Sequence, residues 1–110
     1  MENPNTNTHT SQEIINRIDE HLTKSGREYY SDFFVGITND INKVLFHKHH
    51  VSYDRGWWAY MTANSPDEAY KVWTHYKNMG MRSSKVNHED GSSIVYCYAV
   101  TPYTVESWKE

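Results

Sequence analysis

The chain has 110 residues and a formal net charge of −3 with neutral histidines. This length fits one domain with a modest core and excludes a cofactor domain joined to a separate substrate domain. The charge excludes a global basic field that would gather nucleic acid, and the single cysteine excludes a disulfide framework and a cysteine-based zinc site. At 37% hydrophobic residues, we expect no membrane span.

The first ten residues, MENPNTNTHT, are polar and lack periodicity. They predict a disordered tail over 1–10, ahead of a single domain over 11–110. No apolar core of a signal peptide is present, so we expect a cytoplasmic protein. A first helix is predicted over 12–25, capped by Ser11 and ended by Gly26. Its apolar positions have helical spacing and are Ile14, Ile15, Ile18 and Leu22.

The middle of the chain predicts two strands around a short helix. Residues 29–37 (YYSDFFVGI) are aromatic and β-branched, which favours a strand. The next residues, Thr38 to Asp40, suit the start of a helix, which we expect to end near His49. The apolar face of that helix is Ile41, Val44 and Leu45. Residues 57–61 (WWAYM) predict a strand buried on both faces.

The clearest local signal is at residues 65–68. Ser65 is the predicted N-cap of a helix over 66–79, Pro66 occupies its first position, and Glu68 completes a capping box. Gly80 ends that helix. Trp73 and Tyr76 lie on one side of it, which indicates packing against a sheet.

The last predicted strand covers 94–100 (IVYCYAV) and alternates from face to face. Tyr96 and Tyr98 share a face that we interpret as a half-exposed surface or an interface. Cys97 lies on the other face, where we expect it to be buried and inert. The element order α-β-α-β-α-β predicts an α+β fold, with a small three-stranded sheet packed by about three helices.

The segment FVGITND (34–40), with the strand before it and the short helix after it, resembles the second signature of the GIY-YIG nuclease family. An aromatic residue, an aliphatic residue and a glycine stand at a strand end, and a small residue follows two positions after the glycine. The resemblance covers roughly residues 29–80 and implies a GIY-YIG-like fold. Members of this family hydrolyse phosphodiesters with a divalent metal, a tyrosine, an arginine and a glutamate.

The resemblance also implies a degenerate member. Phe34 stands at the position of the family's tyrosine and has no hydroxyl group, Val44 stands at the arginine, and Trp73 stands at the glutamate. We therefore expect no catalytic residue, no metal site and no cofactor, and we expect nuclease activity to be lost.

The candidate ligand contacts are cationic or polar side chains of the kind that touch phosphates. They are Thr38, Asn39, Lys43, His47, Lys48, Arg55, Arg82 and Lys85. The run from His47 to His50 lacks the third and fourth ligands of a metal site, so we interpret it as an exposed helix end. The pair Trp57-Trp58 suits a stacking platform for bases, but we favour packing of one ring on each side of the sheet.

Three functions remain open on this reading. The first is a non-catalytic binding module on a degenerate GIY-YIG-like scaffold, which contacts nucleic acid or a nucleotide. The second is a protein-interaction module, a small inhibitor or adaptor in a homo-oligomer or heterocomplex, which the aromatic content of 15% favours. The third is a residual metal-dependent nuclease. Lys43 or Arg55 would replace the arginine, and Glu68 or Asp67 would hold the metal.

Overall fold

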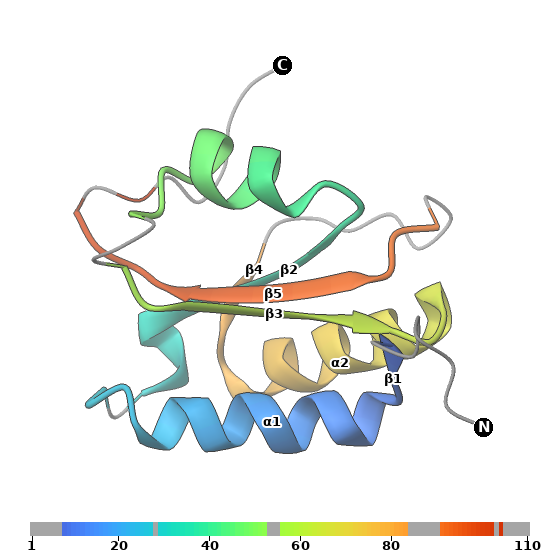
Figure 1. Cartoon of the computed structure of the whole chain (residues 1–110). Coiled ribbons are helices and arrows are strands. Elements are labelled where there is room, and N and C mark those ends of the chain that lie inside the picture. The colour runs from blue at the N-terminus through green and yellow to red at the C-terminus, as the bar shows by residue number, and fades with distance from the viewer. Residues whose placement is uncertain (1–7, 28, 53–55, 84–90, 103, 105–110) are drawn as a thin grey trace.

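The computed structural model describes residues 8–27, 29–52, 56–83, 91–102 and 104. They form a five-stranded mixed sheet between two layers of helix (Figure 1). Helices α1 (Ser11–Thr23) and α2 (Pro66–Met79) cover the lower face of the sheet as drawn, and a π-helix (Asn42–Lys48) covers the upper face. No helix in these residues has the length and apolarity to cross a membrane.

The strand order is β1-β3-β5-β2-β4. The strands are β1 (Thr8–His9), β2 (Phe33–Thr38), β3 (Trp58–Ala63), β4 (Arg82–Ser83) and β5 (Ile94–Ala99), with a 3₁₀ turn at Tyr30–Asp32. β5 lies between β2 and β3 and is antiparallel to both, while β1 and β4 pair in parallel at the two edges. The α+β class is confirmed. The predicted number of three strands is wrong, because two-residue strands are too short to show alternation in a sequence.

The chain joins the fold earlier than predicted. Thr8 and His9, which we placed in the disordered tail, form β1 against Thr62 and Ala63 of β3. Thr10, and not Ser11, is the N-cap of α1, because its hydroxyl accepts a hydrogen bond from the backbone N–H of Glu13. The rest of the predicted tail, 1–7, lies outside the described residues.

The strand predicted over 29–37 begins only at Phe33. The backbone N–H of Asp32 donates to the carbonyl of Tyr29 and closes a 3₁₀ turn over the first part of that segment. Tyr29 is exposed. The β-propensity of tyrosine reflects packing on a sheet, and it does not hold an unpacked backbone in a strand.

The sheet separates two cores. The lower core holds Val95 and Cys97 of β5 with the apolar faces of α1 and α2, including Trp73 and Tyr76, as predicted. Cys97 is fully buried, as expected, and burial raises the pKa of its thiol to about 12. Trp57 packs against the lower core and Trp58 against the upper core, which confirms the packing interpretation of this pair.

The two tyrosines of β5 are not half-exposed. Tyr96 and Tyr98 are buried in the upper core under the π-helix, with Phe34 and Leu45. By contrast, Tyr60 of β3 is 46% exposed, so the prediction that this strand is buried on both faces is wrong. The π-helix explains both results, because its side chains pack in the upper core with residues of β2 and β5 and contact β3 at Trp58.

Helix α2 begins and ends as predicted, with Ser65 at the N-cap and Gly80 in the left-handed conformation at the end. The side chain of Glu68 has a different role from the one expected. Its Oε1 accepts a hydrogen bond of 2.7 Å from the backbone N–H of Ser11, in the first turn of α1. Glu68 therefore joins the starts of the two helices, and this bond, followed by the one from Lys71, holds the pKa of Glu68 below its usual value.

We expect Glu68→Gln to lower the free energy of unfolding near neutral pH and to reduce the loss of stability in acid. The lowered pKa of Glu68 in the folded protein means that the carboxylate stabilises the fold above its ordinary pKa of 4.5. This contribution is lost as the pH falls through the lowered pKa. Urea unfolding near neutral pH and at about pH 3 measures both effects. Glu20→Gln, at an exposed position of α1, is the control, and equal behaviour of the two variants would contradict the role of Glu68.

Candidate binding surface

Two of the predicted ligand contacts hold the chain together after β2. Thr38 is only 8% exposed, and its hydroxyl accepts a hydrogen bond from the backbone N–H of Asp40. The side-chain oxygen of Asn39 accepts one from the backbone N–H of Ser93. Thr38 therefore stabilises its own turn, and Asn39 joins that turn to the residue before β5.

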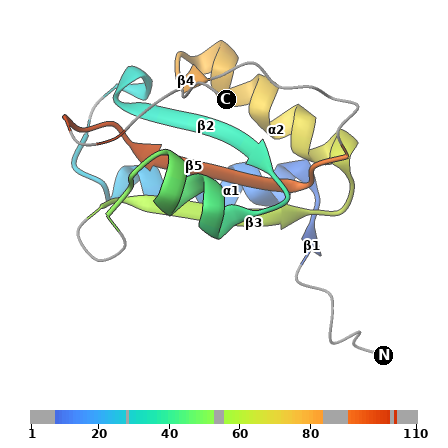
Figure 2. The same cartoon turned by 90° about the horizontal axis from the view of Figure 1, so that it is seen from above.

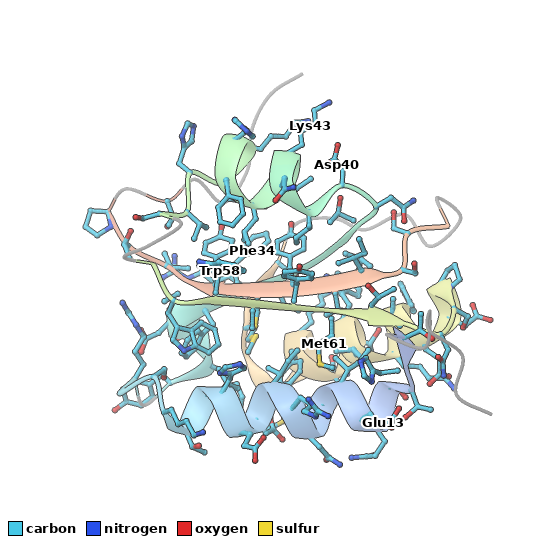
Figure 3. All side chains as sticks on the ribbon, in the orientation of Figure 1. Glu13, Phe34, Asp40, Lys43, Trp58 and Met61 are labelled. Atoms are coloured by element: carbon cyan, nitrogen blue, oxygen red, sulfur yellow. The ribbon has the colours of Figure 1, made fainter. Side chains whose placement is uncertain are left out.

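Three other predicted contacts come together on the π-helix. Lys43 and His47 are exposed and Lys48 is partly buried, above the sheet. Figure 3 shows Lys43 and Asp40 at this end of the molecule. The carboxylate of Asp40 accepts a hydrogen bond from the backbone N–H of Lys43, so an acidic group lies beside these cations.

The remaining predicted contacts do not extend this group. Arg82 lies on β4, the edge strand next to β2, and its Nε donates a hydrogen bond of 2.9 Å to the carbonyl of Ser31. Arg55 and Lys85 fall outside the described residues. Within the described part of the chain, Lys43, His47 and Lys48 are thus the predicted ligand contacts that lie together on one helix.

The three positions that the nuclease resemblance assigns to catalysis lie on different sides of the sheet. Phe34 and Val44 pack in the upper core, and Trp73 is buried in the lower core. Glu68, the alternative metal ligand, is bonded to Ser11 and Lys71. Among the described residues, no three His, Cys, Asp or Glu side chains are grouped so that they would hold a metal ion.

A buried histidine is the main polar feature that the sequence analysis missed. His49 is fully buried, although we treated the run from His47 to His50 as exposed. Its Nε2 lies 2.8 Å from the hydroxyl of Tyr96 and its Nδ1 lies 2.9 Å from the hydroxyl of Tyr98. Each ring nitrogen of His49 therefore has a buried tyrosine hydroxyl as a hydrogen-bond partner.

The end of the π-helix directs His49 toward the sheet. The backbone N–H of His49 donates to the carbonyl of Val44, and His50 then turns the chain with a φ of 58°. Gly36 of β2 lies opposite Tyr96, and a Cβ there would be 2.4 Å from the tyrosine ring. The two tyrosines on one face of a predicted strand were the available signal, because buried hydroxyl groups require partners.

A groove lies on the other side of the molecule, between α1 and β3. Its volume is about 440 Å³. The residues that line it come from these two elements and are Arg17, Ile18, Glu20, His21, Lys24, Trp58, Ala59, Tyr60 and Met61. The rings of Trp58 and Tyr60 stack with centroids 6.2 Å apart. The groove therefore combines charged side chains from a helix with aromatic side chains from a strand.

The outer edge of β3 opens onto this groove. Among the described residues, β1 pairs with β3 at Thr62 and Ala63. The backbone N–H of Ala63 donates to the carbonyl of Ser93, so Ala63 and every second residue before it direct their backbone N–H and C=O groups toward β5. Tyr60 lies between two such residues and directs its backbone groups away from β5. No strand within the described residues pairs with Tyr60 on that side. Its backbone N–H and C=O thus face the outside of the sheet.

Comparisons of the chain with protein-family models, with curated proteins and with solved structures found no match. The candidate surfaces are therefore judged on their geometry and chemistry.

We expect His49→Leu to destabilise the fold by about 2–4 kcal/mol, because it removes the hydrogen bonds from the imidazole to two buried tyrosine hydroxyls. The triple variant His49→Leu, Tyr96→Phe, Tyr98→Phe should be more stable than the single variant, since all three polar groups are then removed together. Urea unfolding measures both. His47→Leu on the exposed side of the π-helix is the control and should change stability by at most about 0.5 kcal/mol. A triple variant less stable than His49→Leu would contradict this account.

Proposed function

We propose that the chain is a non-catalytic binding module that captures an extended protein segment by strand addition at the outer edge of β3. The observation that supports it most directly is the outward-facing backbone of Tyr60 beside the α1–β3 groove. An unpaired strand edge presents alternating donors and acceptors, which an extended peptide satisfies with its own backbone.

The structure of the edge favours this use. β1 is a strand already added to β3, and its described residues, Thr8 and His9, pair with the last two residues of that strand. The segment Ala59–Met61 carries no lysine or proline, the residues that commonly protect a sheet edge. The exposed ring of Tyr60, stacked on Trp58, adds apolar surface of the kind enriched at protein interfaces.

These features favour the protein-interaction alternative over contact with nucleic acid. Thr38 and Asn39 stabilise the turn after β2, and Arg82 bonds to Ser31. The net charge of −3 supplies no long-range attraction for phosphates. A degenerate GIY-YIG-like scaffold acting in the cytoplasm is compatible with this function, because strand addition requires no catalytic residue.

The test compares two substitutions at Tyr60. Tyr60→Pro removes the outward N–H, and a proline whose missing N–H would face out of an edge strand is compatible with a sheet. Tyr60→Thr keeps the N–H and removes the ring. A random peptide library is selected on the wild-type chain, and the affinity of the selected peptides is measured by fluorescence polarisation. We expect Tyr60→Pro to weaken binding about tenfold and Tyr60→Thr to weaken it less.

Thermal unfolding shows whether the Tyr60→Pro chain is folded. Selection of no peptide, or equal binding by the folded proline variant and the wild type, would overturn strand addition. Short single-stranded DNA and RNA are tested in parallel. Binding that falls steeply with salt and weakens on Lys43→Ala would identify the π-helix as a phosphate-binding surface instead.

A further inference from the structure

The wall of the groove formed by α1 is positively charged. Arg17, His21 and Lys24 all line the groove, as residues spaced three or four apart on a helix do. Glu20 is the one acidic residue among those that line it. The ion pairs found in the described part of the chain are His9–Glu13 and Lys71–Glu68, and Arg17 contributes a weaker charge interaction that helps to lower the pKa of Glu13.

The opposite side of the β3 edge is aromatic. Ala59 and Met61 pack toward the lower core and α1, whereas Trp58 packs toward the upper core. Side chains alternate along a strand, so Tyr60 lies on the upper face with Trp58, in agreement with the stacking of their rings. Figure 2 looks down on this upper face, with α1 beyond the sheet. Figure 3 shows Trp58 above the sheet and Met61 below it.

A strand added at this edge would present its own side chains alternately to these two environments. On the basis of the proposed strand addition, we infer that the bound segment is acidic on alternate positions. Asp or Glu side chains face Arg17 and Lys24 below the sheet, and apolar side chains between them pack against Tyr60 above it. The partner is thus an extended protein segment in which acidic and apolar residues alternate.

This pattern fits a peptide better than a nucleic acid. Nucleic acid offers no row of alternating N–H and C=O groups to pair with the backbone at Tyr60. The cations beside the groove are few, and Glu20 lies among them. A peptide of about five or six residues, the usual length of a strand, is long enough to contact both walls.

The experiment uses two synthetic peptides with the same apolar residues, alternating with Glu in one and with Lys in the other. Their affinities for the full chain are measured by fluorescence polarisation at low and at raised salt. We expect the acidic peptide to bind at least about tenfold more tightly, with a preference that decreases as salt screens the charges.

Charge reversal locates the interaction. The double variant Arg17→Glu, Lys24→Glu should weaken binding of the acidic peptide about tenfold, because two attractions become repulsions. The matched control Lys43→Glu, Lys48→Glu makes the same change of charge on the π-helix and should leave the affinity nearly unchanged. Equal losses in both double variants would show a general charge effect and would overturn the proposed site.

The remaining outcomes separate this inference from the proposed function. If library-selected peptides require the N–H of Tyr60 while the acidic and basic peptides bind equally, the acidic pattern is wrong and strand addition stands. If no peptide depends on that N–H, both fail. Binding of the acidic peptide only after deletion of residues 1–7 would assign the edge to the chain's own start. A wild-type dimer that Tyr60→Pro dissociates would assign it to a second copy, and tighter binding of an RNA oligomer would assign the groove to nucleic acid.

Discussion

The burial of β5 on both faces is the constraint that organises this fold. A strand with apolar residues on one face and tyrosines on the other needs a cover on each side. Helices α1 and α2 cover Val95 and Cys97 with apolar side chains. The π-helix must also provide a polar partner for two buried hydroxyls, and His49 provides one nitrogen for each. A hydrogen-bonded pair of this kind fixes one position of the helix on the sheet, because misplacement would leave buried polar groups unsatisfied.

The same constraint explains why one edge of the sheet remains accessible. The π-helix has seven residues and packs mainly over β2 and β5. Tyr60 therefore stays exposed on the upper face. On the lower face α1 lies along β3 and brings its cations beside the edge. The groove thus depends on α1, which forms its charged wall, and on the short upper helix, which leaves Tyr60 of β3 exposed.

The sequence was sufficient to predict those elements that depend on interactions between neighbouring residues. Ser65, Pro66 and Gly80 act within their own helix, and α2 was predicted with its observed bounds. It was insufficient where a side chain bonds far along the chain. Glu68 matched a capping box, but its carboxylate bonds to Ser11. Likewise, the alternation of β5 was evident in the sequence, but the burial of its tyrosine face depends on the π-helix and on His49.

In the candidate site, too, local features could be predicted from the sequence and long-range contacts could not. Residue types that contact phosphates were recognisable, but the sequence did not show that Thr38 is bonded to Asp40 in its own turn or that Asn39 is bonded to Ser93, far along the chain. The edge at Tyr60 and the cations of α1 are more than thirty residues apart, and only the packing of α1 on β3 brings them together. A pattern read along the chain contains no information on such a juxtaposition.

The central position of β5 also affects how the protein is made. β2 and β3 pair with β5 and not with each other, and β5 is the last strand among the described residues. During translation, at about 5–20 residues per second, both strands leave the ribosome seconds before the strand that joins them. The sheet is therefore completed only after β5 has been synthesised, and until then the nascent chain exposes the apolar residues of β2 and β3 to chaperones and to other chains.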